Sequence, residues 1–269
     1  MTATLHFAKA HAYGNDFLYV RAGAVAAAAL DVLAREVCDR HTGVGADGLI
    51  VYEPTPDGAA MRLFNADGSR SEVSGNGVRG LAALILRENA ALVAAELTIH
   101  TEAGPKKLTR LGESNGRPMF RAYMGRPEGV RQVPAAAAGE LLQLAVLNIG
   151  NPQCVLLGPL PDEDRFRRLG AALERHGMFP ERTNVEFAQV EAPGRVRIVI
   201  WERGVGPTSS SGTGSCAALV AAASFGGAAR EAEVIAPGGA QRVEWREDGV
   251  YLTGWVEVVC DGDWLRPLP

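Results

Sequence analysis

The sequence predicts an α+β protein built from two similar halves. Its 269 residues are 47% hydrophobic and 22% charged, the balance of an ordinary globular chain that is long enough to bury a core. Glycine occurs 32 times and gathers in short polar strings between apolar segments. Several of these strings occur twice, about half a chain length apart. We therefore expect two domains, residues 1–130 and 131–269, each a curled, mostly antiparallel sheet around a buried central helix.

The repeated strings match at an offset of 136 to 137 residues. Three pairs correspond: Gly14-Asn15 with Gly150-Asn151, Phe64-Asn65 with Trp201-Glu202, and SGNG at 74–77 with SGTG at 211–214. Agreement of three landmarks at one offset indicates two pseudo-symmetric halves. The segment RPEGVRQVPAAAAGE lies between them and contains two prolines and an alanine run. We expect it to be the linker.

Each half is predicted to open with two strands and a helix. The strand segments are 5–9 and 17–20 in the first half, and 145–149 and 154–157 in the second. The helices are expected over 25–38 and 163–176. The acidic run Asp162-Glu163-Asp164 fits the start of the second helix, because negative side chains favour the positive end of a helix dipole.

A second helix is predicted in each half, directly after the Ser-Gly-x-Gly loop. Strand-like segments at 61–63 and 197–200 lead toward these loops. The following runs, GVRGLAALILREN and GSCAALVAAASF, are apolar on nearly all faces, so as helices they must be buried rather than lie on a surface. Short β-rich segments then close each half, separated by turns such as Gly238-Gly239 and Asp248-Gly249.

Charge and composition exclude several classes of protein. The 27 Lys and Arg against 31 Asp and Glu give a net charge of −4, without the basic field expected for nucleic-acid or anionic-membrane partners. The N-terminal sequence lacks the pattern of a secretion signal, and the longest apolar run, 22–30, is too short to span a bilayer. The four cysteines are scattered, which predicts reduced thiols and no metal site. We expect a cytoplasmic protein.

The paired Ser-Gly-x-Gly loops are candidates for an anion-binding site. Each places the free N–H groups of a helix start at the loop, where they and the helix dipole attract negative charge. Ser74 and Ser211 could simply cap their helices, as serine commonly does. Two symmetric copies instead favour a ligand site in a cleft between the halves. Groups on opposite walls suit a reaction that removes a proton from one face of a carbon and returns one to the other.

The motifs resemble those of the diaminopimelate epimerase family. They are AKAHAYGNDF, DRHTGVGADG, FNADGSRSEVSGNGVR, IGNPQ, RTNVEF and WERGVGPTSSSGTGSCAA, in order from about Lys9 to Ala218. The resemblance implies a cofactor-independent isomerase that interconverts LL- and meso-diaminopimelate in lysine and cell-wall synthesis, with the active site between its two domains. The partners it implies are a small amino-acid substrate and a second copy of the chain in a homodimer. The substrate-binding positions carried over motif by motif are Asn15, Asn65, Gly75, Asn76, Asn151, Asn184, Glu202, Arg203, Gly212 and Thr213.

The sequence departs from the family pattern at four positions. The two catalytic cysteines of the family fall on Ser74 and Ser211. The histidine usual after GNP falls on Gln153, and the acidic or amide residue usual after RGxG falls on Pro207. Serine is a much weaker acid than cysteine, so reduced activity is expected. Engineering would explain the two serines but not the other two changes, which favours natural divergence of the site.

Three functions are therefore compared. The first is diaminopimelate epimerisation with Ser74 and Ser211 as catalytic residues. The second is a related isomerase or dehydratase of another small amino acid, and the third is a non-catalytic amino-acid-binding protein. Outside these loops we expect structural roles: Asp47 as a turn residue, Arg79 as a buried charge that needs a carboxylate partner, and Cys216 in the core.

Overall fold

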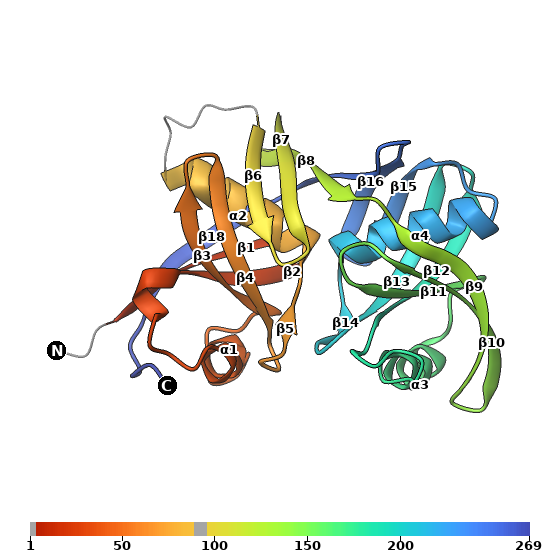
Figure 1. Cartoon of the computed structure of the whole chain (residues 1–269), viewed down its shortest axis with the longest axis horizontal. Helices are drawn as coiled ribbons and strands as arrows, with labels where there is room; N and C mark the ends of the chain where they lie inside the picture. The colour runs from red at the N-terminus through yellow and green to blue at the C-terminus, as the bar shows by residue number, and fades with distance from the viewer. Residues whose placement is uncertain (1–3, 89–95) are drawn as a thin grey trace. The chain divides into compact units, whose positions relative to one another are not determined.

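The computed structural model describes residues 4–88 and 96–269, which form two compact units (Figure 1). Unit 1 comprises Met1–Ala122 and Trp255–Pro269, and unit 2 comprises Tyr123–Gly254. Each unit combines two α-helices with a mixed, mostly antiparallel sheet. The α+β class predicted from the sequence is confirmed.

Unit 1 contains most of the first half of the sequence. Its elements are β1 (Leu5–Ala12), β2 (Asn15–Arg21), the short 3-10 helix η1 (Ala22–Val25), α1 (Leu30–Cys38), β3 (Gly48–Thr55), β4 (Gly58–Asn65), β5 (Arg70–Ser71), α2 (Gly75–Glu88), β6 (Glu96–Thr101), β7 (Gly104–Ser114), β8 (Arg117–Gly125), whose end passes into unit 2, and β18 (Glu257–Trp264).

The elements of unit 2 are β9 (Glu128–Ala137), β10 (Glu140–Asn148), β11 (Pro152–Leu157), α3 (Glu163–Glu174), β12 (Asn184–Ala192), β13 (Arg195–Glu202), β14 (Gly206–Thr208), α4 (Gly212–Phe225), β15 (Glu231–Ala236), β16 (Gly239–Trp245) and β17 (Val250–Trp255). From β10 to β17 they follow the order of β1 to β8 in unit 1, apart from η1.

Strand pairing repeats as well, so the two units share one topology. In unit 1, β2 pairs with β3 in parallel, β3 with β4 antiparallel, and β4 with β6 in parallel. In unit 2, β11 pairs with β12 in parallel, β12 with β13 antiparallel, and β13 with β15 in parallel. The internal repeat read from three short strings thus extends through the secondary structure of both units.

The strands that follow β8 and β17 account for the unit boundaries. After β8 the chain forms β9, which pairs antiparallel with β10 of unit 2. After β17 it forms β18, which pairs antiparallel with β1 of unit 1. The two compact units therefore divide the chain at 122/123 and 254/255. The expected linker is largely strand β9, in which Pro134 is tolerated opposite Gln143.

The central helices α2 and α4 are buried as predicted. All residues from Gly75 to Ile85 and from Gly212 to Ala222 are buried. Helix α2 packs against strands that include β1, β2 and β4, and α4 packs against strands that include β11, β12 and β13. Small residues permit this close approach: a Cβ on Gly80 would lie only 2.0 Å from the Tyr19 hydroxyl.

Helix α1 is shorter than the 25–38 predicted. The chain forms η1 at Ala22–Val25, and α1 begins only at Leu30. Ala29 has extended backbone dihedral angles, and its N–H donates to Pro269 O at 3.0 Å. The alanine run gives no local signal for this break, because alanine favours helix at every position. Helix α3 begins at Glu163 as predicted, and the Asp162 carboxylate caps it by accepting from Arg165 N at 2.8 Å.

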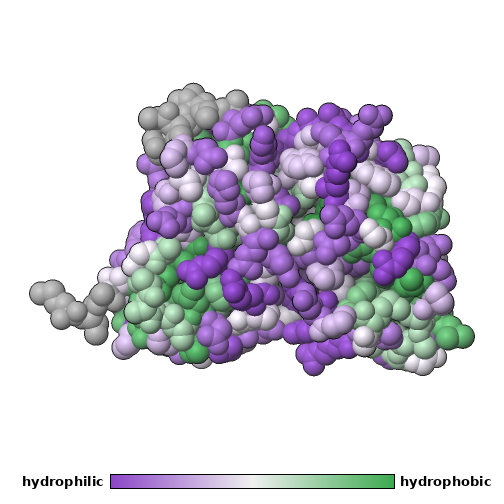
Figure 2. Space-filling model, viewed as in Figure 1, coloured by the Kyte–Doolittle hydropathy of each residue, from purple (hydrophilic) through white to green (hydrophobic). Residues whose placement is uncertain are grey.

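Hydrophilic side chains dominate the molecular face in Figure 2, with smaller hydrophobic areas among them. Large hydrophobic side chains that are exposed include Leu141 of β10 at 91% and Leu265, just after β18, at 74%. Across residues 4–88 and 96–269, every helix falls short of the length and hydropathy needed to cross a membrane.

Candidate functional site

Ser74 lies at the start of α2, where the chain turns from β5 into the buried helix. Its Oγ accepts a hydrogen bond from Gly77 N at 3.2 Å, and its carbonyl oxygen accepts from Val78 N at 2.9 Å. The side chain is buried, with the whole residue only 6% exposed. The capping role considered from the sequence is therefore present, and it holds the hydroxyl beside the first N–H groups of the helix.

Two predicted binding amides meet beside this helix start. Asn76 Nδ2 donates to Asn15 Oδ1 at 3.0 Å, joining the first turn of α2 to the beginning of β2. Arg79, which is fully buried one turn further along, donates to Asn76 Oδ1. The guanidinium of Arg79 also lies 5.9 Å from the centre of the Tyr13 ring. The hydrogen bond observed for Arg79 thus goes to an amide of its own helix, and it orients that amide.

The other end of the Asn15 amide is held by a carboxylate. Asn15 Nδ2 donates to Asp47 Oδ2 at 2.7 Å, and Asp16 N donates to the same oxygen at 3.1 Å. Arg40 Nη2 lies 2.7 Å from both Asp16 Oδ1 and Asp47 Oδ1, and Lys9 Nζ lies 2.9 Å from Asp16 Oδ2. Asp47, expected to be a turn residue, is part of a charge cluster behind Asn15 in which the two carboxylates are nearly buried and the Arg40 side chain is half exposed.

The two carboxylates of this cluster titrate in opposite directions. Burial, followed by the negative charge of Asp16, raises the pKa of Asp47 above its ordinary value. Burial would also raise the pKa of Asp16, but hydrogen bonds from Arg40 and Lys9 outweigh it and lower that pKa. Asp16 is therefore the member that holds its negative charge more strongly.

Asn65, the third predicted amide of unit 1, ends β4. Its backbone N–H donates to Ser69 O at 2.8 Å, and its Nδ2 donates to Ser69 Oγ at 3.0 Å. Gly68 N donates back to Asn65 O at 2.9 Å. This tight loop fixes Asn65, which is 6% exposed, at the end of the strand that leads toward Ser74.

Ser211 occupies the equivalent position in unit 2. It is the N-cap of α4, and its Oγ accepts from Gly214 N at 3.1 Å. Ser215 Oγ donates to Ser211 O at 2.7 Å, and Gln241 Nε2 donates to the preceding Ser210 Oγ at 2.9 Å. Ser211 is 3% exposed. The two serines thus make the same local hydrogen bond, three residues into their own helix.

Polar side chains from three elements gather around the start of α4. Asn151 Nδ2 donates to Thr213 Oγ1 at 3.5 Å, and Asn184 Nδ2 donates to Pro152 O at 3.3 Å. The Gln153 amide can be oriented in two ways. In one orientation, Nε2 donates to Asn151 Oδ1 at 2.6 Å. The other satisfies both of its ends: Nε2 donates to Glu186 Oε1 at 3.0 Å, and the oxygen accepts from Thr213 Oγ1 at 3.2 Å.

Glu186 is a fully buried acid that the sequence did not single out. Burial, followed by the charge of Glu202, raises the pKa of Glu186 well above its ordinary value, so the neutral acid is favoured. A Cβ on Gly214 would lie 2.6 Å from Glu186 Oε1 and 3.1 Å from Ser211 Oγ. Gly214 is required here because the buried carboxyl and the serine approach the same point of the helix.

Glu202 ends β13 and Arg203 follows it, and a second buried acid supports the turn that begins here. Arg203 N donates to Asn184 Oδ1 at 2.9 Å, and Arg203 Nη1 donates to Glu181 O at 3.1 Å. The carboxylate of Glu174 accepts from Trp201 Nε1 at 3.0 Å and from Gly204 N at 3.0 Å. Glu174 thus contacts the residues on either side of the Glu202-Arg203 pair. Nothing in the sequence of α3 indicated these contacts.

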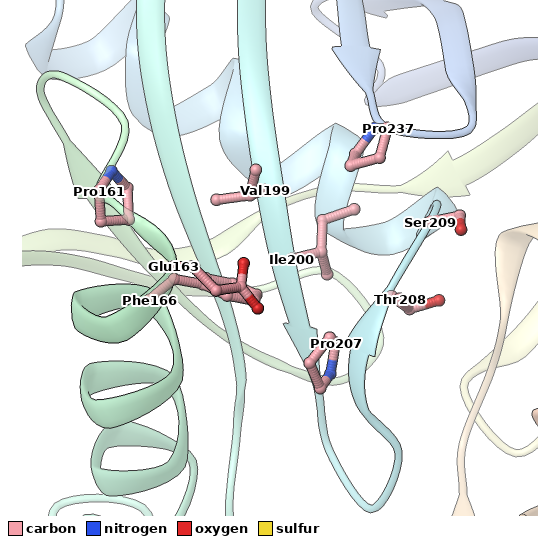
Figure 3. A pocket seen from close by; sticks show the side chains of 9 residues that line it. All are labelled: Pro161, Glu163, Phe166, Val199, Ile200, Pro207, Thr208, Ser209 and Pro237. Carbon is pink, nitrogen blue, oxygen red and sulfur yellow. The ribbon is translucent and has the colours of Figure 1, made fainter.

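Hollows on the described part of unit 2 include the following two. One, of about 290 Å³, is lined by Val199 and Ile200 of β13 between α3 and β14 (Figure 3). Of the four positions that depart from the family pattern it includes Pro207, and its lining is Pro161, Glu163, Phe166, Val199, Ile200, Pro207, Thr208, Ser209 and Pro237. The other, of about 340 Å³, includes Gln153 together with Glu128 and Arg131. It therefore reaches the cluster around α4.

The structure assembles the predicted residues as two groups, one in each unit. Asn15, Ser74, Gly75 and Asn76 lie together at α2, and Asn151, Asn184, Ser211, Gly212 and Thr213 lie together at α4. That the two groups form one site stays a prediction. Within the described residues, no group of three or more His, Cys, Asp or Glu side chains is arranged to hold a metal ion.

Comparison with known proteins identifies the family. The family model described as diaminopimelate epimerase matches residues 7–130 and 145–259. The chain is 40% identical to the diaminopimelate epimerase of Desulforudis audaxviator, over 97% of this chain and 100% of that protein. It is 37% identical to that of Pelotomaculum thermopropionicum, over 97% and 99%.

Solved structures share the fold. A hydroxyproline epimerase from Agrobacterium vitis, solved with bound trans-4-hydroxy-L-proline, aligns with a TM-score of 0.72 at 16% identity and covers 98% of this chain and 94% of that one. At this identity the likeness concerns the fold alone. The sequence relatives and the family model together place the chain in the diaminopimelate epimerase family.

Proposed function

We propose that the protein is a diaminopimelate epimerase that interconverts LL- and meso-diaminopimelate by proton transfer at the α-carbon. Its substrate would be held by the predicted binding residues of both units, and Ser74 and Ser211 would exchange the proton. The reaction inverts one carbon without net oxidation or reduction, so it requires a base on one face and an acid on the other.

The repeated helix start is the observation that supports this proposal most. Each unit places a serine and polar side chains at the first turn of a buried helix, and a glycine N–H of that turn donates to the serine hydroxyl. Such a turn attracts a carboxylate through its N–H groups and its dipole. The same groups stabilise the negative charge that develops on the carboxylate side when the α-proton leaves.

Glu202 and Arg203 are proposed to bind the charged ends of the amino acid. A carboxylate accepts hydrogen bonds from an ammonium group, and a guanidinium binds a carboxylate in a two-pronged geometry. Arg203 is 7% exposed and is anchored through its backbone to Asn184. Anchoring of this kind reduces the entropy lost when the ligand binds.

The chemical step would be slow with serine. One hydroxyl must lose its proton before it can take the α-proton, while the other donates its proton to the opposite face. Serine has a far higher pKa than cysteine, so the reactive alkoxide is scarce near neutral pH.

A second candidate is a protein that binds an amino acid without epimerising it rapidly. The observation that favours it is that both hydroxyl groups already accept helix N–H bonds as caps. A cap of this kind is stable without any proton transfer. In this case the binding residues would hold a zwitterion, and the α-proton would stay in place.

Exchange in D₂O distinguishes the candidates. The protein is incubated with LL-diaminopimelate, and with a panel of other L-amino acids, while NMR follows loss of the α-proton signal. The proposal expects exchange and formation of the meso isomer with diaminopimelate, abolished in the Ser74→Ala, Ser211→Ala double variant. Binding without exchange supports the second candidate. Exchange confined to another amino acid indicates a divergent isomerase, and exchange that survives in the double variant excludes the serines.

A further inference from the structure

A hydrogen-bonded chain with a single direction runs through the ligand-side amides of unit 1. Arg79 donates to Asn76 Oδ1, Asn76 Nδ2 donates to Asn15 Oδ1 at 3.0 Å, and Asn15 Nδ2 donates to Asp47 Oδ2 at 2.7 Å. A buried cation begins this chain and a carboxylate ends it. Each amide therefore accepts from one neighbour and donates to the next.

This polarity fixes which way both amides face. An isolated asparagine can rotate by half a turn and exchange its donor and acceptor with little loss. Here, rotating Asn15 would turn its oxygen toward the Asp47 carboxylate and its nitrogen toward Asn76 Nδ2. Both contacts would become repulsive, so the orientation of Asn15 depends on the negative group behind it.

Asp47 is itself held rigidly. Besides Asn15, its Oδ2 accepts from Asp16 N at 3.1 Å, and its Oδ1 lies 2.7 Å from Arg40 Nη2. Its own backbone N–H donates to Asp16 O at 2.9 Å. The Asp47 side chain is 12% exposed, so water competes little for these bonds. A rigid, nearly buried acceptor can impose its geometry on a neighbouring side chain.

The equivalent amide in unit 2 has a different anchor. Asn151 lies 3.5 Å from Thr213 Oγ1, and its neighbour on β11 is Gln153. The acid of that cluster, Glu186, contacts Gln153 in the orientation that satisfies both ends of its amide. The Asn15 amide thus donates directly to a carboxylate, whereas the Asn151 amide contacts Thr213 and Gln153.

We propose that Asp47 is a positioning residue that sets the orientation of Asn15, and through it of Asn76, for the polar end of an amino-acid ligand. The inference rests on the proposed function for the identity of that ligand. The orientation itself is a property of unit 1 and can be measured without a ligand.

Four variants test the role. Asp47→Ala removes the acceptor, Asp47→Glu keeps the charge but displaces the carboxylate by one methylene, and Asp47→Asn keeps an oxygen that can accept from Asn15. Asp39→Ala is the matched control, because Asp39 lies in the same loop and accepts from His41 N at 2.9 Å and Thr42 N at 2.6 Å without touching Asn15.

Two readouts are collected on each folded variant. NMR records the side-chain amide signals of Asn15 and Asn76 in the free protein, and calorimetry measures the dissociation constant for meso-diaminopimelate. We expect Asp47→Ala and Asp47→Glu to shift both amide signals and to raise the dissociation constant about tenfold, the worth of one hydrogen bond to a charged group. In Asp47→Asn the amide signals and the dissociation constant should stay close to those of the wild type. Asp39→Ala should change neither the signals nor the dissociation constant.

Different results would overturn the positioning role of Asp47 and the proposed function. Unchanged amide signals in Asp47→Ala, or equal shifts in Asp39→Ala, overturn the positioning role whatever the ligand is. If Asp47→Ala does not fold, unchanged signals and affinity in Asp47→Glu overturn it in the same way. A wild-type protein that does not bind diaminopimelate overturns the proposed function, while the amide signals still decide the role of Asp47.

Discussion

In one orientation of its amide, Gln153 contacts the buried Glu186 beside the start of α4, with the amide nitrogen 3.0 Å from the carboxyl Oε1. The two residues come from neighbouring parallel strands, β11 and β12. A neutral acid suits this position, because it accepts from the amide without placing a full charge in the protein interior. The contact links the position where the family usually has histidine to an acid that is fully buried.

Replacing Glu186 with glutamine should flatten the dependence of stability on pH. Burial, and then Glu202, raises the pKa of Glu186 well above the ordinary value that it regains on unfolding. The folded protein therefore holds this proton more tightly than the unfolded chain does. Its contribution to the free energy of unfolding is complete at low pH and is lost as pH rises toward the folded pKa, by at most about 1.4 kcal/mol per pH unit.

Urea unfolding of Glu186→Gln and the wild type between pH 5 and 9 checks this. The variant should gain stability relative to the wild type as pH rises. Glu233→Gln, at an exposed position of β15, is the control and should follow the wild type throughout. A difference between Glu186→Gln and the wild type that does not change with pH would show that Glu186 titrates in the same way in both states.

Adding a methyl group at Gly80 should destabilise unit 1. The new Cβ would lie 2.0 Å from the Tyr19 hydroxyl, which donates to Gly77 O at 3.1 Å. Overpacking of a core typically costs about 1–3 kcal/mol, and here it would also break that hydrogen bond. Gly194→Ala is the matched control, since a Cβ there meets nothing within 4 Å. Equal midpoints of urea unfolding for the two variants would contradict the packing of Tyr19 against α2.

The local sequence predicted where the buried helices α2 and α4 begin, because the signals for a helix start lie in neighbouring residues. Ser74 and Ser211 stand before glycine and before runs that are apolar on all faces, and both helices begin within one residue of these serines. The pairing of β18 with β1 could not be read in this way. It joins segments some 250 residues apart, and it depends on how the whole chain is connected.

The supporting residues were missed for a similar reason. Asp47 precedes a glycine, and that pattern is typical of a turn. Its hydrogen bond to Asn15 spans 32 residues and exists only once β2 and β3 pair in parallel. Glu174 likewise looks like one more acidic residue of α3 until folding brings it to Trp201. Binding motifs are contiguous in sequence, whereas the groups that hold them in place are not.

Replacing Arg203 with lysine should weaken binding of diaminopimelate although the charge is kept. The arginine head bonds Glu181 O at 3.1 Å through Nη1, and its planar fork suits a two-pronged grip on a carboxylate. Lysine cannot make both contacts in the same geometry. Charge-assisted hydrogen bonds contribute about 1.5–3 kcal/mol, so the dissociation constant should rise at least tenfold in calorimetry. An unchanged value would remove Arg203 from the proposed binding residues.

Introducing cysteine at both serine positions should accelerate epimerisation strongly. Each serine Oγ already accepts a helix N–H bond, from Gly77 at 3.2 Å and from Gly214 at 3.1 Å. A thiolate in the same place would accept the same bond, and a helix N-terminus lowers the pKa of a thiol toward neutral pH. A hydroxyl starts from a far higher pKa, and each unit of that difference costs 1.36 kcal/mol of proton-transfer driving force.

The double variant Ser74→Cys, Ser211→Cys should therefore raise the rate of α-proton exchange by about two to three orders of magnitude, the usual contribution of acid–base catalysis. Each single variant should give little gain in formation of the meso isomer, because inversion needs a competent group on both faces of the carbon. Gln153→His, added to the double variant, tests whether the missing histidine limits the gain. Rapid exchange by the unmodified protein, or no gain from the two cysteines, would show that the proton moves elsewhere.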